Sequence, residues 1–486
     1  MGRHLAVTAA CLLLIHPVSR PAAAPDPPTE VERYVASQME AQHIPGLSYA
    51  VIQNGLVVKS GALGLANVEL NAPANDATEF AIASMSKAVT ASAVILLAQD
   101  GALSIDDLVS KYLSGAPETW KGMTIRQLLT HTSGMKDHFR DSPAYPPLTI
   151  DRRLSYSDEE YLKAHIDAPL NFPPGTQWAY SGGGYVILGA IIARVTGHPY
   201  GDYLRERIFR PLGMQHSHLI SVADIIPNRA SGYWFRDGAL RNGGYTGQAH
   251  ISGPDVGVMT TATDLAKWVI AISVARLWTA ASRDVIWTPA TLSDGRDAVS
   301  FPAASGYGLG WAVRTYRGYR IVGHGGTLVN GFTSTFFAIP EKQIAVIVLT
   351  NQYDANPQAI ALGIAARYEV DLTPPSDMRI QPDTDETATG RAKAFFDAVL
   401  RGSDLSQLAT PGLAKHLSAM WHPPGPAPGP EPSFAFIARE DVKRALQRFG
   451  ADVARLAHYK VHIDGDDHWF TVYLTADGRI ADFEAF

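Results

Sequence analysis

The first hundred residues show apolar patterns of a helix, a β-hairpin and a second, very apolar helix. Residues 31–42 place apolar side chains at helical spacing. Residues 47–53 and 56–60 are strand candidates, and the Asn-Gly pair between them is a strong hairpin signal. Residues 80–98 then form a long apolar stretch. The chain is therefore predicted to open with a helix and a hairpin, followed by a buried helix.

Helical segments dominate the middle of the chain, and strands return late. Between about residues 100 and 300, Pro and Gly interrupt short helical patterns, and residues 186–195 predict one apolar helix. Strand patterns reappear at residues 319–322, 332–339 and 344–349. Strands at both ends with helices between them do not match βαβ alternation. The pattern predicts an α+β fold, with an antiparallel sheet flanked by helices and an inserted helical region.

The last part of the chain predicts a separate small α+β domain over residues 391–486. Residues 373–390, rich in Pro, Asp and Thr, have the composition of a linker. The predicted helices are residues 391–400 and 439–449, separated by a proline-rich loop at 422–433, and the predicted strands are residues 459–463, 469–474 and 479–483. No chemistry is assigned to this domain.

The N-terminus has the pattern of a secretory signal peptide, expected over residues 1–24. A short basic start precedes apolar residues 5–15, and Ala22-Ala23-Ala24 offers a small-residue cleavage site. The apolar run is too short to span a bilayer comfortably, so no stable membrane span is expected. The only cysteine, Cys11, lies within this segment. We therefore expect a secreted or periplasmic protein of a bacterial cell envelope, without disulfides.

Composition excludes some classes of function. The chain has 46% hydrophobic and 18% charged residues, as globular proteins do. The 41 basic and 47 acidic residues give a net charge of −6 without a dense basic block, so nucleic-acid binding has no electrostatic footprint. The 486 residues allow two or three domains, of which residues 25–372 are predicted to form the main one.

Ser84 and Lys87 are the first candidates for chemistry. Lys87 is the only charged residue between residues 80 and 98, and burying an ammonium group is costly unless it is paired or neutralised. Three residues along a helix bring Ser84 onto the same face. A desolvated lysine beside a hydroxyl can make serine a nucleophile. The alternative is an ordinary core helix, from which Lys87 reaches solvent and which Ser84 caps.

Two glycine-rich segments add further candidates. Tyr180 precedes three glycines and an apolar helix, and a tyrosine beside a lysine can take and return a proton. Alternatively, its ring only packs the loop onto the core. His324 lies in Gly323-His-Gly-Gly-Thr327 at the end of a predicted strand, where glycines let a substrate approach the backbone. Alternatively, this segment is a bulge with a surface histidine.

In this order, the three elements resemble the penicillin-binding, serine β-lactamase-like hydrolase family, which includes class C β-lactamases, D-alanyl-D-alanine carboxypeptidases, D-aminopeptidases and related esterases. The family pattern is S-x-x-K, then Y-x-N, then K-T-G or H-x-G. This chain has Ser84-Met-Ser-Lys87, Tyr180-Ser-Gly182 and His324-Gly-Gly326. Similar stretches occur at residues 125–134, 211–214, 257–265 and 307–311. The resemblance covers about residues 30–370 and implies a β-lactamase/transpeptidase-like fold.

The resemblance also implies roles. Ser84 would be the acylated nucleophile, while Lys87 and Tyr180 would share proton transfer, with the identity of the base left open. The backbone N–H groups of Ser84 and Thr327 would form the oxyanion hole, each donor typically being worth about 3–4 kcal/mol. The implied substrate-binding residues are His324, Gly325, Gly326 and Thr327. No metal and no cofactor is implied.

One departure from the family pattern affects the expected substrate. Gly182 stands where the family commonly has an asparagine, whose amide usually contacts the lysine and the substrate. Its replacement makes efficient penicillin hydrolysis less expected. The leading interpretation is an enzyme that cleaves D-amino-acid peptides, like a carboxypeptidase or aminopeptidase. An esterase, a β-lactamase and a non-catalytic penicillin-binding sensor remain alternatives, and the partner is a small-molecule or peptide substrate. The oligomeric state stays open.

Other sites receive less support from the sequence. No Gly-x-Ser-x-Gly segment occurs, which argues against an α/β-hydrolase. Ser133 lies in a Thr-Ser-Gly turn without an obvious base. His216 and His218 have the spacing of a metal pair, but no acidic residue lies near them in the sequence, so no metal site is predicted.

Overall fold

The computed structural model describes residues 29–139, 146–300, 305–420, 432–442, 446–463 and 466–485. The predicted signal peptide, residues 1–24, lies outside these ranges, as does most of the proline-rich loop predicted at 422–433.

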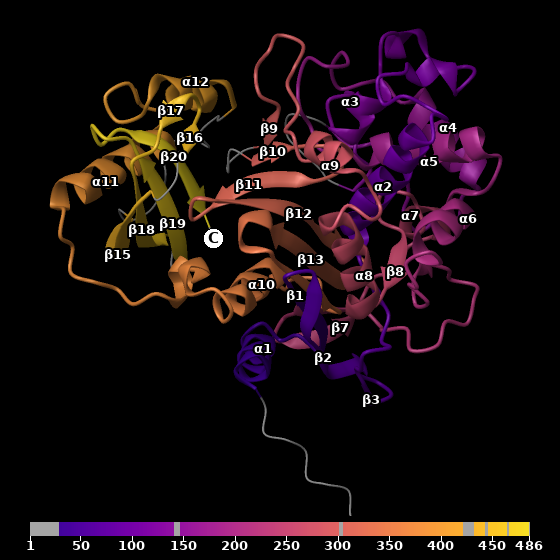
Figure 1. Ribbon diagram of the computed structural model, residues 1–486, viewed down its shortest axis with the longest axis horizontal. Coiled ribbons are helices and arrows are strands. Elements are labelled where there is room, and N and C mark those ends of the chain that lie inside the picture. Colours follow the sequence, from indigo (N-terminus) through magenta and orange to yellow (C-terminus); the bar gives the residue numbers. More distant parts are fainter. Residues whose placement is uncertain are drawn as a thin grey trace, which may run out of the picture.

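A nine-stranded antiparallel sheet forms the centre of the main part of the molecule (Figure 1). Its strands, in spatial order, are β3 (Ala72–Pro73), β2 (Leu56–Asn67), β1 (Gly46–Gln53), β14 (Ile344–Thr350), β13 (Phe332–Ile339), β12 (Tyr319–Leu328), β11 (Ala312–Tyr316), β10 (Ser305–Tyr307) and β9 (Val299–Ser300). The central pairing joins the early strand β1 to the late strand β14. The expected sheet with strands from both ends of the main region is confirmed.

Helices cover both faces of this sheet, which explains why its central strands are apolar on both sides. In β1, Ala50 and Ile52 face one core, while Tyr49 and Val51 face the other. Helices α1 (Glu30–Ala41) and α10 (Pro357–Ala366) pack on the second face. Helix α8 (Ala262–Ser273) packs across β1 and β14 on the first face.

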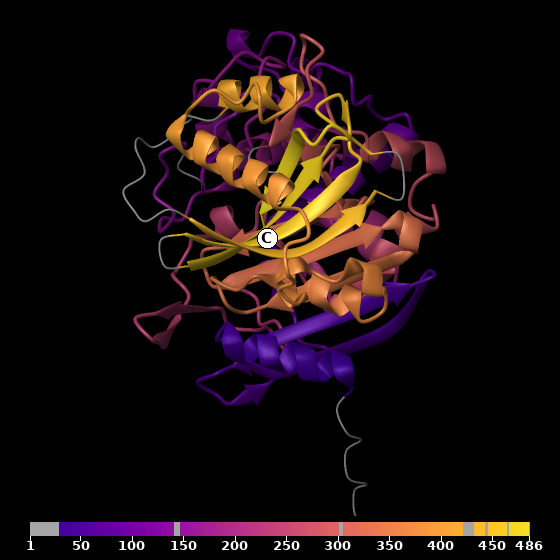
Figure 2. The ribbon, with the colours of Figure 1, turned by 90° about the vertical axis from the view of Figure 1, so that its left-hand side faces the viewer.

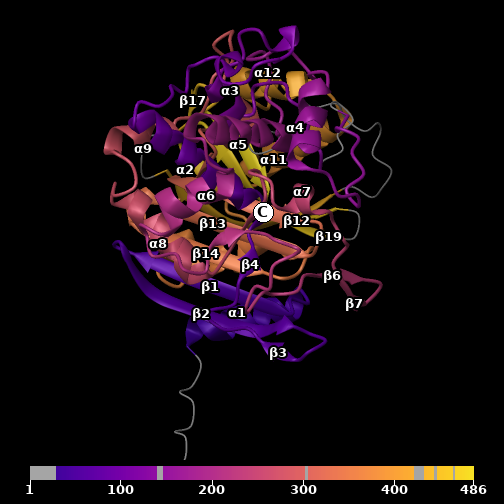
Figure 3. The same cartoon turned by 90° about the vertical axis from the view of Figure 1, so that its right-hand side faces the viewer.

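The predicted helical region lies on the side of α8 (Figure 3). Its helices are α2 (Ser86–Gln99), α3 (Ile125–Leu129), α4 (Asp158–Asp167), α5 (Gly182–Thr196), α6 (Tyr200–Leu204), α7 (Gln248–Ile251) and α9 (Ala280–Ile286). Small sheets add β4 (Phe80–Ala81), β5 (His218–Leu219), β8 (Val258–Thr260), β6 (Tyr233–Arg236) and β7 (Ala239–Asn242). Helix α2 is buried along most of its length and packs against α5 and α6. Among the described residues, no helix combines the length and apolarity needed to cross a membrane.

A second, four-stranded antiparallel sheet lies at the C-terminus, beside the β11–β12 end of the large sheet (Figures 1 and 2). It consists of β15 (Ser433–Asp441), β18 (Arg455–Ile463), β19 (Asp466–Leu474) and β20 (Ile480–Ala485), with the short pair β16 (Gln447–Arg448) and β17 (Ala451–Asp452). Helices α11 (Glu386–Arg401) and α12 (Pro411–Met420) share a hydrophobic core with one face of the sheet. The three predicted strands are confirmed, and α11 begins at Glu386, within the range predicted as a linker.

The helix predicted at residues 439–449 is wrong. Residues up to Asp441 belong to β15, and Gln447–Arg448 form β16, while residues 443–445 lie outside the description. Strand β15 pairs with β18, with Phe434 opposite Val461. Pairing with a neighbouring strand outweighs the local helical periodicity, which is a weak determinant of structure.

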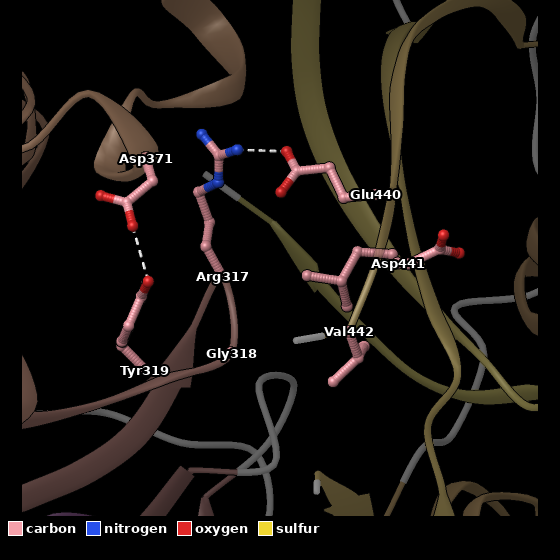
Figure 4. Close-up of a pocket in the computed structure, with 8 residues that line it drawn as sticks. Arg317, Gly318, Tyr319, Asp371, Glu440, Asp441 and Val442 are labelled. Atoms are coloured by element: carbon pink, nitrogen blue, oxygen red, sulfur yellow. Dashed lines mark hydrogen bonds and ion pairs between the residues drawn. The ribbon is translucent and has the colours of Figure 1, made fainter. Parts of the chain in front are cut away.

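Charged side chains line the junction between the two sheets. Figure 4 shows Arg317, after β11, reaching the carboxylate of Glu440 on β15, while Tyr319 Oη donates to Asp371 Oδ2 at 2.6 Å. His458, fully buried on β18, lies 3.2 Å from the same Glu440 carboxylate. The ion pair of Arg317 with Glu440 therefore attaches the C-terminal part to the β11 side of the large sheet.

Candidate active site

Ser84 lies in the tight turn between β4 and α2. It is the middle residue of a single 3-10 turn, η1 (Ala83–Met85). Ala83, directly before it, has a φ of 50°, in the left-handed region that residues other than glycine rarely adopt. Such strain persists where the surroundings fix it, and here Ile82 N–H donates to Val258 O at 3.0 Å. Ser84 thereby lines a cavity of about 570 Å³.

Lys87 is buried beside this serine. Its side chain is 2% exposed, and Nζ donates to Ser84 Oγ at 3.2 Å and to the main-chain oxygen of Asp255 at 3.0 Å. The interpretation as an ordinary core helix requires Lys87 to reach solvent, and the side chain does not do so. When its amine is neutral, Nζ can accept the proton that leaves Ser84 Oγ during nucleophilic attack.

Tyr180 joins the same group from the loop before α5. Lys87 Nζ lies 4.9 Å from the centre of its ring. The loop is fixed by His131, whose main-chain oxygen accepts from Ala179 N at 3.0 Å and whose Nδ1 accepts from Ser181 N at 3.2 Å. The structure thus brings the three predicted catalytic side chains together from two separate segments.

The predicted substrate-binding segment lies on β12, opposite the nucleophile. His324 is buried, with Nδ1 2.5 Å from Gly325 O and Nε2 2.9 Å from Tyr307 Oη. A carbonyl can only accept, so Nδ1 donates and, in a neutral ring, Nε2 accepts from Tyr307. Gly325 and Thr327 are exposed at the cavity. His324 therefore holds Tyr307 at the cavity wall.

Gly326 allows η1 to approach β12. A Cβ at this position would lie 2.4 Å from Ile82 O and 2.9 Å from Ala83 Cβ, in the turn that carries Ser84. We expect Gly326→Ala to push the turn away from the strand, lowering the free energy of unfolding by about 1–3 kcal/mol, as overpacking typically does. Thermal unfolding would measure this loss.

Gly325→Ala is the matched control for Gly326→Ala. Its added Cβ would meet only Ser334 O, at 3.6 Å, an ordinary van der Waals contact. Its unfolding temperature should equal that of the wild type. Equal unfolding temperatures for both alanine variants would show that η1 has room to move.

Two buried side chains at the site were missed by the sequence interpretation, Asp255 and His138. Asp255 Oδ2 lies 3.9 Å from Lys87 Nζ and 3.3 Å from His138 Nε2. A signal for Asp255 existed, because it is the only charged residue in the apolar segment 251–259, as Lys87 is in its own. His138 has no comparable signal, since it lies in a loop after α3.

Gly182 allows these two side chains to approach Lys87. A Cβ on Gly182 would lie 2.7 Å from Asp255 Oδ2 and 2.7 Å from His138 Cε1. The space that an asparagine would need here is thus filled by Asp255 and His138. The lysine has a carboxylate partner in place of an amide.

Electrostatics favour an ionised Asp255. Burial alone would raise the pKa of this carboxyl group, but the neighbouring charges of His138 and Lys87 outweigh it and hold the pKa below its ordinary value. His165, which contacts His138, behaves differently. Burial, with a further contribution from His138, lowers the pKa of His165 to about 3, so its ring is neutral at neutral pH.

The candidate metal pair has an acidic neighbour that the sequence did not reveal. Glu79 Oε1 lies 3.2 Å from His216 Nδ1, and Glu79 Oε2 lies 3.3 Å from His218 Nε2. Within the described ranges, no group of three such side chains has a geometry suited to a metal ion. The contacts are those of histidines paired with a buried carboxyl group.

Solved structures with a similar fold include penicillin-binding proteins. The octameric penicillin-binding protein homologue from Pyrococcus abyssi has a TM-score of 0.60 at 23% identity, covering 92% of this chain and 96% of that one. The penicillin binding protein from Bacillus halodurans has a TM-score of 0.57 at 26% identity, covering 71% and 99%. A D-stereospecific amidohydrolase from Streptomyces sp. has a TM-score of 0.56 at 22% identity, covering 68% and 97%.

Sequence relatives and a family model also match this chain. Protein flp of Staphylococcus aureus is 27% identical over 331 residues, 67% of this chain, and the chain spans 63% of that relative's length. The unguisins hydrolase ungD' of Aspergillus campestris is 30% identical over 353 residues, 68% of this chain and 62% of the relative. The Beta-lactamase family model matches residues 31–369. This chain therefore belongs to the Beta-lactamase family, whose fold and hydrolase relatives agree with the resemblance of its three motifs.

Proposed function

We propose that this protein is an exported serine hydrolase that works through an acyl-enzyme on amide or ester substrates related to D-amino-acid peptides. The observation that carries the proposal is the hydrogen bond of 3.2 Å between the buried Lys87 Nζ and Ser84 Oγ. It pairs a nucleophile with a base, at the edge of a cavity large enough for a small substrate.

Acylation uses groups that already lie together. Ser84 Oγ attacks the substrate carbonyl carbon, and its proton passes to Lys87 Nζ, directly or through Tyr180 Oη. The resulting oxyanion is assigned to the backbone N–H groups of Ser84 and Thr327, whose segments approach each other at Gly326. The proton then goes to the leaving amine or alcohol as its bond to the carbonyl carbon breaks. Deacylation reverses these roles, with water as the nucleophile.

The amide class is supported by relatives and by the fold. The Streptomyces neighbour is a D-stereospecific amidohydrolase, and the Aspergillus relative is a hydrolase of unguisins. Both share this fold or family, so cleavage of a D-amino-acid amide or peptide is the leading assignment for this chain. Penicillin hydrolysis is the less favoured assignment, because Asp255 and His138 fill the space of the usual asparagine.

The cavity lining favours an esterase as the second candidate. Apart from His324, the described side chains that line it are neutral, among them Trp178, Tyr180, Tyr307 and Asn356. His324 already bonds to Tyr307 and to Gly325 O through its two ring nitrogens. Such a lining suits an uncharged ester or an internal amide better than a free substrate carboxylate.

Intact-protein mass spectrometry separates these candidates. The protein would be incubated in parallel with a penicillin, an activated ester and a D-alanyl amide. We expect the mass of an acyl group on Ser84 with the ester or the amide, followed by its loss on turnover. A penicillin adduct that persists would indicate a penicillin-binding peptidase or sensor, and rapid penicillin turnover a β-lactamase. No adduct and no turnover with all three compounds would contradict the proposed function.

Export is proposed on the signal-like pattern of residues 1–24. The same mass measurement tests it when the protein is expressed from its full-length gene in a bacterium and recovered from the periplasm or medium. A mass lacking the first 24 or so residues supports export with cleavage. An intact chain confined to the cytoplasm contradicts it.

A further inference from the structure

A chain of buried ionisable side chains leads from Lys87 away from the cavity. Asp255 Oδ2 lies 3.9 Å from Lys87 Nζ and 3.3 Å from His138 Nε2. His138 Nδ1 lies 3.1 Å from His165 Nε2, and His165 Nδ1 lies 2.8 Å from Tyr161 O. These four side chains are between 0% and 2% exposed. Only Lys87 among them contacts the proposed nucleophile.

The order of donors and acceptors fixes where the protons lie. The oxygen of Tyr161 can only accept, so His165 Nδ1 carries a proton, and the neutral His165 ring then accepts at Nε2. His138 Nδ1 must donate to it, which places a proton on that nitrogen. A neutral His138 would then carry an unprotonated Nε2 only 3.3 Å from the Asp255 carboxylate, so that two groups rich in electrons would face each other without a proton between them. The contact is favourable only when a second proton lies between these two groups.

That second proton belongs on His138, because a charge on this ring, more than one on Lys87, is what holds the pKa of the buried Asp255 carboxyl group below its ordinary value. His138 and Asp255 then form a buried ion pair with no net charge. A proton on Lys87 as well would leave one positive charge in excess at a site shielded from water, and an excess charge there is costly. One carboxylate is thus shared by two bases, and the histidine is the nearer of them, since Asp255 Oδ2 lies 3.3 Å from His138 Nε2 and 3.9 Å from Lys87 Nζ.

We propose that His138 is held as an imidazolium by Asp255 and His165, and that this ion pair keeps Lys87 as the neutral amine that accepts the Ser84 proton. The proposal rests on the proposed function for its catalytic consequence, and assigns Asp255, His138 and His165 as positioning residues. In the native enzyme, the proton from Ser84 would give Lys87 its charge only during acylation, when it lies beside the Asp255 carboxylate. It returns to the leaving group afterwards.

Other ionisable groups around the pair come from every neighbouring element. They are Asp137 in the same loop, Tyr161 on α4, Tyr180 and Tyr185 beside Lys87, Tyr200 on α6 and His250 on α7. Asp137 is held by main-chain N–H groups, since it accepts from Phe139 N at 2.6 Å and from Gly182 N at 3.3 Å. Burial lowers the pKa of His250 to about 4, so this ring is neutral at neutral pH. Arg152, which helps to lower the pKa of His250, is a cation outside this buried group, with its guanidinium carbon 5.9 Å from the centre of the Phe139 ring.

Nitrogen-15 NMR tests directly, without relying on activity, which ring nitrogens of His138 carry a proton. Nitrogen-15 spectra of histidine-labelled protein, with the His138 signals assigned by their loss in His138→Gln, would report both ring nitrogens at pH 8. We expect both to be protonated in the wild type, and His138 to become neutral in Asp255→Asn. A neutral His138 ring in the wild type at pH 8 would overturn the proposal, even if Ser84 were never acylated.

The catalytic consequence appears in the pH profile of acylation by p-nitrophenyl acetate. In His138→Gln the Asp255 carboxylate pairs with Lys87 and favours its protonated form. The midpoint of the rising limb should move at least one pH unit upward, so that acylation below it is at least about tenfold slower, while the plateau at high pH is retained. An unchanged midpoint, or a plateau lost without a shift, would overturn the proposal.

His250→Gln is the matched control. It removes another buried histidine ring, 6.3 Å from the ring of His138, but one that is already neutral. Its midpoint should match that of the wild type, and an equal upward shift would attribute the effect to packing and overturn the proposal. Absence of Ser84 labelling in the wild type would instead contradict the proposed function, with the nitrogen-15 result still deciding the state of His138.

Discussion

Replacing Ser84 with alanine should abolish the acyl adduct and reduce kcat by about 10⁶-fold, the cost observed when a serine hydrolase loses its nucleophile. The structure explains why the loss should be confined to chemistry. Ser84 Oγ is hydrogen-bonded to Lys87 Nζ. The start of η1 is held by a main-chain contact that alanine preserves, from Ile82 N, the residue before the turn, to Val258 O. Intact mass after incubation with the activated ester, together with its turnover rate, would measure both losses.

Ser92→Ala is the matched control for this prediction. Ser92 is a buried serine of α2, and its Oγ donates to Ala88 O at 2.8 Å within the helix. It lies outside the described cavity lining, so labelling and turnover should remain those of the wild type. Ser84→Ala protein that still forms the adduct would place the nucleophile on another residue.

The central strands β1, β2, β12, β13 and β14 of the large sheet were predictable from local signals, whereas the short outer strands β3, β9, β10 and β11 were not predicted. The Asn-Gly pair turns the first hairpin, and the apolar runs of β13 and β14 leave little choice besides buried strands. The pattern of strands at both ends of the main region, with helices between them, predicts that early and late strands pair in one sheet. The pairing of β1 with β14 could be expected as an architecture, but its register depends on packing between two helical layers.

The C-terminal part shows where local patterns fail. The segment from Arg439 has helical periodicity, yet β15 continues through Arg439 because its backbone pairs with Ala457 on β18. Phe434 and Phe436 before it alternate as in a strand, and a proline-rich stretch at 422–433 obscured that signal. A strand of this kind is fixed by its neighbour, which sequence periodicity does not reveal.

The candidate site likewise contains residues that the sequence predicts and residues that only the folded structure reveals. Ser84, Lys87 and Tyr180 are found from spacing and from a charge within an apolar run, and the structure places them around one cavity. Asp255 and His138 come from a turn before β8 and a loop after α3, and only the folded chain brings them to Lys87. The replacement at Gly182 was visible in the sequence, but its compensation by a carboxylate was not.

Replacing Lys87 with methionine should slow acylation of Ser84 by about 10²- to 10⁴-fold, the usual contribution of a general base. Methionine keeps an unbranched side chain, one heavy atom shorter than that of lysine, and removes the amine. Asp255 retains His138 as its charge partner in this variant, so folding should persist. The rate of adduct formation with the activated ester tests the effect, measured by mass spectrometry on samples quenched at successive times. Circular dichroism checks the fold.

Lys267→Met controls for loss of a lysine elsewhere in the same part of the protein. Lys267 on α8 donates to Asp264 Oδ1 at 2.7 Å and to Gly213 O at 2.6 Å, and it is absent from the described cavity lining. Its acylation rate should be unchanged. If Lys87→Met reacted within tenfold of the wild type, Tyr180 would be the base by itself. The buried ion pair of Asp255 and His138 would then have no catalytic effect through Lys87.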